Sequence, residues 1–146
     1  MAEMRYESIE ATSLSSAEAI YKIVSNLNNL SKVENLFPKD KVSDIQFDED
    51  NVSFKVDGLG QKVKISVEER VPNQQVRFVA HTAITDVKLR LTCKEVSQAD
   101  TRLRITIEAD LPMMFRMMLE KQIQEILDNS VRMLAQFPFE QWANEI

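Results

Sequence analysis

The sequence predicts an α+β fold in which one long C-terminal helix covers an antiparallel sheet. Two observations support this. Between residues 41 and 111, apolar and polar residues alternate with a period of two in six successive runs, separated by turn-forming segments such as DEDN, DGLGQ and PNQQ. Strands with one apolar and one polar face, joined by short turns, are typical of an antiparallel meander. Residues 112–136 then carry apolar residues at helical spacing.

The N-terminal part is expected to supply one more strand and two short helices. Residues 4–12 favour a strand, because Tyr, Ile and Thr occur there and a turn follows. SLSSAEAIYKIVSN predicts a helix with Ser15 as N-cap and Glu18 as its capping-box partner. LNNLSKVENLFP predicts a second short helix that ends before Pro38. The expected order is therefore one strand, two short helices and six further strands.

The long helix is expected to turn one stripe toward the sheet. At about 100° per residue, this stripe contains Phe115, Leu119, Ile123, Ile126, Ser130, Met133, Leu134 and Phe137. Pro138 should end the helix, because proline cannot continue the backbone hydrogen-bond ladder. The tail PFEQWANEI should then pack Phe139 or Trp142 back onto the fold.

Length and composition limit the classes of function. The 146 residues suit one domain over 1–146, and a net charge of −5 argues against general binding to nucleic acid. One cysteine and one histidine leave no disulfide framework and no multi-histidine metal site, so neither metal nor cofactor is expected. The sequence shows no secretory signal and no apolar run near the ~20 residues of a spanning helix. A cytoplasmic protein without an integral membrane segment is expected.

This order of elements resembles the helix-grip fold of the START, birch-pollen-allergen and polyketide-cyclase (SRPBCC) superfamily. SLSSAEAIYKIVSNLNNLSKVENLFP resembles its first-strand exit and helix pair, VKISVEERVPNQQVRFVA its central hairpin, and ADLPMMFRMMLEKQI its passage into the long helix. The resemblance implies a seven-stranded curved antiparallel sheet wrapped around the C-terminal helix. It also implies an apolar cavity between them that binds lipids, sterols or polyketides. Some relatives are cyclases or hydrolase-like enzymes, and others are co-chaperone or quinone-related partners.

The expected function is non-catalytic binding of a lipid-like or polyketide-like molecule between the sheet and the long helix. The inferred inward positions of the strands are nearly all apolar, and apart from one thiol they offer no titratable group for acid–base catalysis. Ser130 could bond back to the carbonyl of Ile126 or anchor the ligand. The expected contacts are Phe54, Phe78, Leu89, Ile105, Met118, Ile126 and Ser130, with Met114 and Met117 near the entrance.

Two other functions stay open. One is a cyclase-like or hydrolase-like enzyme that uses His81 or Cys93. Cys93 lies among aliphatic residues, which favours a small buried hydrophobe. His81 follows Ala80, so strand alternation places it on the wetter face unless a bulge at the strand end turns it inward. The other is a protein-interaction module with a filled core and no cavity.

Methionine occupies four of the eight residues at 111–118. These side chains could fill core where the last strand passes into the helix. They could instead form a pliable gate, because methionine repacks easily around ligands of different shape. A third interpretation is an exposed patch that docks a partner protein or a second copy of the chain, giving a homodimer.

Overall fold

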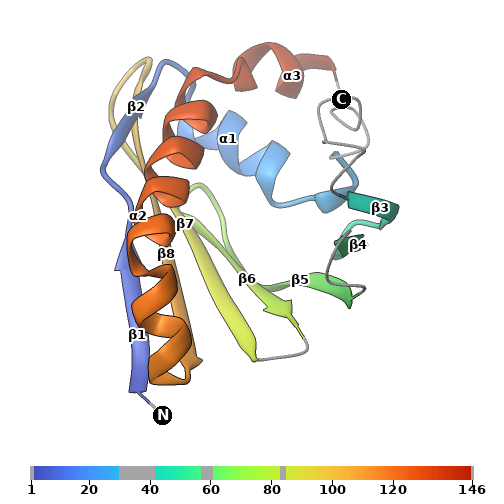
Figure 1. Ribbon diagram of the computed structural model, residues 1–146. Coiled ribbons are helices and arrows are strands. Elements are labelled where there is room, and N and C mark those ends of the chain that lie inside the picture. Colours follow the sequence, from blue (N-terminus) through green and yellow to red (C-terminus); the bar gives the residue numbers. More distant parts are fainter. Residues whose placement is uncertain (1, 30–41, 57–60, 83–84, 146) are drawn as a thin grey trace.

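The computed structural model describes residues 2–29, 42–56, 61–82 and 85–145 (Figure 1). Within these residues, two N-terminal strands precede a helix, six further strands follow, and two helices come last. The elements are β1 (Ala2–Glu7), β2 (Ala11–Ser13), α1 (Ala17–Val24), β3 (Val42–Phe47), β4 (Asn51–Val56), β5 (Gln61–Val71), β6 (Gln75–His81), β7 (Asp86–Ser97), β8 (Asp100–Leu111), α2 (Met113–Gln136) and α3 (Phe139–Glu145).

The strands form one curved antiparallel sheet in the order β1-β8-β7-β6-β5-β4-β3, and β2 also pairs with β8. The helices lie on one side of this sheet, which we call its inner face (Figure 1). The predicted meander and C-terminal helix are thus confirmed. The predicted first strand is split into β1 and β2 at Ser8, whose hydroxyl replaces a backbone carbonyl as the acceptor for β8. Its N–H donates to the Ile105 carbonyl at 2.8 Å, and its hydroxyl accepts from the Ile105 N–H at 2.9 Å.

The helix after β2 begins one residue later than predicted. Ser16 is its N-cap, and the Ser16 hydroxyl accepts a hydrogen bond of 3.1 Å from the Ala19 N–H. Ser15, the predicted cap, is buried, and its N–H donates to the Ser13 hydroxyl. Of the second predicted helix, 27–29 form a short 3₁₀ turn, while 30–38 lie outside the described residues.

The register of α2 corrects the predicted stripe. Leu127 and Val131 are 3% and 0% exposed, whereas Ile126 is 63% and Met133 is 73% exposed. The physical reason is the position of the helix over β1, β2 and β8 at one edge of the sheet. Residues four apart, such as Ile123, Leu127 and Val131, form the row that faces these strands. The predicted stripe instead took steps of three residues, from Ile123 to Ile126 and from Ser130 to Met133, and these steps placed it on an exposed side of the helix.

The main core lies between α1, α3, β7, β8 and the C-terminal half of α2. Its centre consists of Ile20, Leu103, Val131 and Phe139, each at most 2% exposed. Pro138 separates α2 from α3, and Phe139 packs back into the core, as predicted. Along the described residues, no helix has both the length and the apolar character that crossing a membrane would require.

Candidate functional site

An apolar cavity of about 320 Å³ lies where the ends of α1 and α2 and the helix α3 meet the inner face of β6, β7 and β8. Its volume is near the lower end of the ~300–1,000 Å³ typical of small-molecule sites. The surface is almost wholly apolar, and it is lined by Ile23, Val24, Asn26, Leu27, Asn29, Phe78, Leu89, Arg90, Leu91, Ile105, Leu134, Phe137, Phe139 and Trp142.

The sheet wall of the cavity comes from three neighbouring strands. Phe78 on β6 lies opposite Leu89 on β7, and Leu91 on β7 lies opposite Ile105 on β8. Strand alternation turns these side chains to the inner face together, because residues two apart share a face. Arg90 falls between Leu89 and Leu91, so the same alternation places its side chain on the outer face.

The opposite wall is an aromatic cluster at the break between α2 and α3. The Phe137 ring centroid lies 5.0 Å from that of Phe139 and 4.8 Å from that of Trp142, the latter edge-on. Phe137 is the C-cap of α2 and has an extended backbone, with φ −73° and ψ 138°. The following Pro138 cannot continue the helix, so the chain changes direction after α2 and α3 packs against α1 (Figure 1). Aromatic pairs of this geometry contribute about 0.5–1.5 kcal/mol beyond their buried area.

Two asparagines just after α1, Asn26 and Asn29, are among the lining residues, although their polar atoms contribute little of the cavity surface. The Asn29 side-chain amide donates to the Ile23 carbonyl at 3.0 Å, and the Asn26 side-chain oxygen accepts from the Asn28 N–H at 2.9 Å. These bonds use the Asn29 amide N–H and the Asn26 carbonyl. Each side chain therefore keeps further hydrogen-bonding capacity.

The structure brings together three of the predicted contact residues. Phe78, Leu89 and Ile105 all line the cavity. Phe54 is half-buried opposite Val63 on the inner face, but it does not line the cavity. Ser130 is half-buried on α2 and also lies outside the lining. The prediction that Ile126 faces the sheet is wrong, because most of its surface is exposed. Whether the three lining residues contact a ligand stays a prediction.

The four methionines at the start of α2 lie far from this cavity. Met113, Met114, Met117 and Met118 are 59%, 71%, 75% and 67% exposed, so the core-filling interpretation is wrong. At 1.5 Å per residue, Met114 is roughly 30 Å along the helix from Leu134. The expected gate, with Met114 and Met117 at the entrance and Met118 among the contacts, therefore does not apply to this cavity. An exposed patch remains, and the homodimer stays a prediction.

Neither residue of the enzyme hypothesis lines the cavity. Cys93 is buried, and this burial raises the pKa of its thiol to about 12. A thiol with such a pKa is protonated at neutral pH and is a poor nucleophile. His81 is exposed on the outer face, with its Nδ1 at 3.0 Å from Asp86 Oδ1. Among the described residues, no three His, Cys, Asp or Glu side chains cluster as metal ligands.

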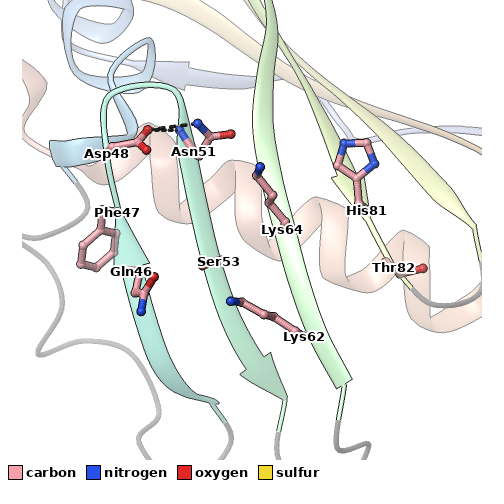
Figure 2. Close-up of a pocket in the computed structure, with 9 residues that line it drawn as sticks. All are labelled: Gln46, Phe47, Asp48, Asn51, Ser53, Lys62, Lys64, His81 and Thr82. Carbon is pink, nitrogen blue, oxygen red and sulfur yellow. Dashed lines mark hydrogen bonds between the residues drawn. The ribbon is translucent and has the colours of Figure 1, made fainter.

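His81 belongs to a second, wide-open hollow of about 740 Å³ on the outer face of β3–β6. Figure 2 shows Lys62, Lys64 and His81 on adjacent strands, with the Asp48–Asn51 turn at one end. Hydrogen bonds from the Asp50 N–H and the Asn51 side chain lower the pKa of Asp48, with a smaller effect from Lys64. The hollow is open to water and is lined by charged residues such as Lys62, Lys64 and Asp48. It therefore lacks the enclosed apolar surface that a hydrophobic ligand requires.

Sequence reasoning missed the walls that come from α1 and from the C-terminal turn. Ile23, Val24 and Leu27 belong to one wall, and Phe137 and Trp142 to the other. The sequence indicated part of the second wall, because the aromatic residues Phe137, Phe139 and Trp142 lie close to Pro138, which ends the long helix. Only the tertiary packing of α3 on α1 shows that these segments face each other.

No protein-family model matches the sequence, and no curated protein is significantly similar to it. Solved structures are similar in fold. A norcoclaurine synthase point mutant from Thalictrum flavum, in complex with a transition-state analogue, has a TM-score of 0.69 and 12% identity over 99% of this chain and 96% of that chain. Protein Mll3558 from Rhizobium loti has a TM-score of 0.61 and 16% identity, covering 99% of this chain and 98% of that chain.

A START superfamily protein from Mycobacterium smegmatis has a TM-score of 0.55 and 14% identity, with coverage of 90% of this chain and 98% of that chain. At such identities the likeness establishes the fold. The chain therefore has the helix-grip fold of the START, birch-pollen-allergen and polyketide-cyclase superfamily, which its sequence pattern resembles.

Proposed function

We propose that the protein binds a hydrophobic small molecule in the cavity of about 320 Å³ and does not catalyse a reaction on it. The single observation that carries this proposal is the almost wholly apolar lining, with Phe78, Leu89 and Ile105 on one side and Phe137 and Trp142 on the other. Burial of apolar ligand surface against such walls contributes roughly 25 cal/mol per Å² before the costs of association.

The apolar lining points to an uncharged, largely apolar ligand. A lipid-like or polyketide-like molecule would place its apolar part among the aromatic and aliphatic walls. A carbonyl or hydroxyl group at its end would bond Asn26 or Asn29, the uncharged polar residues among the lining. A few polar groups in an otherwise apolar pocket typically fix ligand orientation. We place the protein in the cytoplasm in this proposal, because its single cysteine leaves no internal disulfide to form.

The non-catalytic part of the proposal rests on the lining residues. Arg90 is the ionisable one among them, and an arginine stays protonated and cannot act as a general base. The fold by itself does not decide the matter, since the similar norcoclaurine synthase is an enzyme that has been solved with dopamine and hydroxybenzaldehyde. A cyclase-like reaction here would need a proton acceptor near the ligand. Cys93 and His81 lie outside the lining.

Trp142 makes a direct test available, because it is the one tryptophan of the chain and lines the cavity. Its emission should transfer energy to N-phenyl-1-naphthylamine, an uncharged apolar probe, in a saturable titration with one site per chain. Leu89→Phe, which fills part of the cavity, should weaken binding by about tenfold or more. Met133→Phe adds an aromatic ring on the exposed side of α2 and should leave the affinity unchanged.

Equal affinities of the Leu89→Phe variant and the wild type, with both chains folded, would overturn the assignment of the site. Native mass spectrometry of protein purified from its own host would then address the natural ligand. A reproducible co-purifying apolar molecule, recovered by solvent extraction, would identify the ligand class. Loss of that molecule in Leu89→Phe and its retention in Met133→Phe would tie it to this cavity.

A further inference from the structure

A β-bulge in β5 turns Arg70 toward the helices. The pairing of β5 with β6 shifts register between Val67 and Glu69. Unbroken alternation would place Arg70 on the outer face with Lys64 and Ser66. After the bulge, Arg70 instead pairs with Val76, whose side chain is buried on the inner side. Bulges commonly redirect one side chain of a strand in this way.

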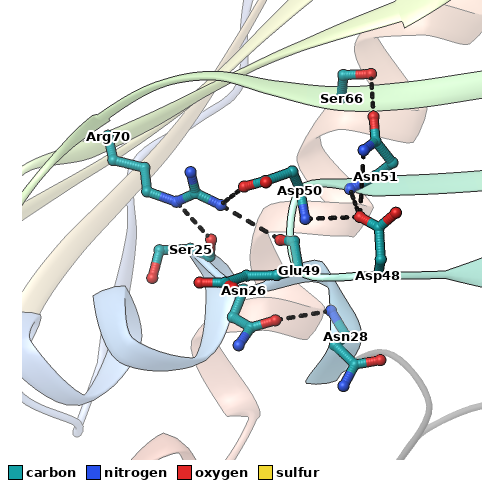
Figure 3. A network of polar contacts seen from close by, with 9 residues as sticks. All are labelled: Ser25, Asn26, Asn28, Asp48, Glu49, Asp50, Asn51, Ser66 and Arg70. Carbon is teal, nitrogen blue, oxygen red and sulfur yellow. Dashed lines mark hydrogen bonds and ion pairs between the residues drawn. The ribbon is translucent and has the colours of Figure 1, made fainter.

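The redirected guanidinium joins the end of α1 to the turn between β3 and β4 (Figure 3). Arg70 Nε donates to the Ser25 carbonyl at 2.9 Å. Its terminal nitrogen lies 2.7 Å from Asp50 Oδ1 and donates to the Glu49 carbonyl at 3.3 Å. Ser25 is the C-cap of α1, where the helix dipole favours a positive charge. A single side chain thus holds three acceptors from two separate segments.

The turn that receives Arg70 is itself well fixed. Asp48 Oδ1 accepts hydrogen bonds from the backbone N–H groups of Asp50 at 2.9 Å and Asn51 at 2.7 Å. The side-chain oxygen of Asn51 accepts from the Ser66 hydroxyl at 2.7 Å, which ties the turn to β5 (Figure 3). Arg70 therefore attaches the end of α1 to a turn whose own conformation is fixed by hydrogen bonds.

The segment that Arg70 holds is a wall of the cavity. Asn26, Leu27 and Asn29 line the cavity and follow directly after Ser25. The Leu27 N–H donates at 3.0 Å to the Glu49 carbonyl, the same carbonyl that Arg70 contacts. Arg70 is not among the lining residues. It can act on a ligand only by fixing the position of this wall.

We propose that Arg70 is a positioning residue that holds the 25–29 wall closed and so limits how fast a ligand enters and leaves the cavity. This inference rests on the proposed function. When the guanidinium is removed, Ser25 in the wall loses its hydrogen bond to Arg70 and so its link to Asp50, while every lining residue is kept. The wall then opens more often, and both the association and the dissociation rates rise. The dissociation rate rises more, because the bound ligand also loses contacts with the displaced Asn26 and Leu27.

Stopped-flow measurement of energy transfer from Trp142 to N-phenyl-1-naphthylamine tests this inference. Arg70→Gln should speed dissociation by about fivefold to tenfold, the change expected when charge-assisted hydrogen bonds are lost. Arg70→Lys should restore part of the wild-type rate, because an ammonium keeps the charge but not the planar fork. Arg77→Gln is the matched control. It breaks a 2.9 Å ion pair with Glu69 on the outer face of the neighbouring strand and should leave the rates unchanged.

Hydrogen exchange separates this inference from the proposed function. The Leu27 amide should exchange faster in Arg70→Gln than in Arg77→Gln without any ligand, because its hydrogen bond depends on the wall position. Wild-type rates in Arg70→Gln, or an equal acceleration in Arg77→Gln, would overturn the role of Arg70 and leave the proposed function standing. A wild-type chain that binds no probe at all would overturn the proposed function, and the gating role with it.

Discussion

The Glu140 carboxylate in α3 accepts a hydrogen bond of 2.6 Å from the backbone N–H of Ser16, 124 positions earlier in the chain. Ser16 is the N-cap of α1. In a capping box the N–H of the N-cap residue is bonded by a residue of the same helix, and the sequence predicted Glu18 for that role with Ser15 as the N-cap. A carboxylate from another helix performs it instead. The bond both completes the cap and fastens α3, which carries Trp142, against α1.

This bond predicts a pH dependence of stability. Hydrogen bonding with the side chain and then the backbone of Ser16 lowers the pKa of Glu140 below its ordinary value of 4.5. The stabilisation is thus complete above pH 4.5 and is lost as the pH falls through the lower, folded-state pKa. Glu140→Gln should lower the Tm at pH 7 by roughly 1–4 °C. Below pH 4.5, the Tm of this variant should also decrease less with falling pH than the Tm of the wild type.

Thermal unfolding followed by circular dichroism between pH 3 and pH 7 checks this expectation. Glu18→Gln is the matched control, since Glu18 lies in the first turn of α1 but does not bond the Ser16 N–H. Identical acid dependence in Glu140→Gln and the wild type would contradict the assigned role.

Two adjacent residues test the register of α2. Leu127 is 3% exposed, and Ile126 is 63% exposed. Leu127→Ala should lower the free energy of unfolding by about 2–5 kcal/mol, because it removes buried methyl groups and leaves a cavity. Ile126→Ala should change it by no more than about 0.5 kcal/mol. Urea denaturation measures both, and the reverse ranking would restore the helix stripe predicted from the sequence.

The strands were predictable from the sequence, whereas the side of the long helix that packs was not. Alternation such as Val63, Ile65 and Val67 marks one face unambiguously, because a strand has only two faces. A helix with apolar residues at Ile123, Ile126, Leu127 and Met133 offers several overlapping stripes. The strands beneath the helix select one of them, and this selection is a tertiary effect.

The candidate site was likewise predictable only where strand alternation determines the side-chain direction, and not where tertiary packing does. The sheet residues Phe78, Leu89 and Ile105 followed from strand alternation, and the structure places them in the cavity lining. Trp142 could be expected to pack back, but not to face Ile23 of α1. Arg70 was hidden by the bulge, since alternation alone assigns it to the wrong face. The single-domain organisation over residues 1–146 stays a prediction.

Cys93 should be unreactive in the folded protein. It is buried, and burial raises the pKa of its thiol from an ordinary value of 9.0 to about 12. The reactive thiolate is therefore scarce, and reagents cannot reach it. At pH 8, a disulfide reagent such as 5,5′-dithiobis(2-nitrobenzoate) should label the native chain at least about a hundred times more slowly than the urea-unfolded chain. Comparable rates would contradict both the burial and the raised pKa.

Replacing the exposed methionines should not affect ligand binding. The double variant Met114→Gln/Met117→Gln changes side chains that are 71% and 75% exposed, roughly 25–30 Å along α2 from the cavity. Its affinity for N-phenyl-1-naphthylamine should stay within about twofold of the wild type. A large loss would return the methionines to the role of a gate. Sedimentation of the same variant beside the wild type tests whether the patch joins two copies of the chain.

The position of the cavity walls also has a consequence for how the protein folds. One wall follows α1 near the start of the sequence and another surrounds α3 near its end, and the contact that fastens them spans 124 positions. The sheet between them is complete only when β1 pairs with β8. Chains that depend on such distant pairings fold slowly, because long loops must close before the contacts form. A nascent chain would thus have its meander in place well before it could hold a ligand.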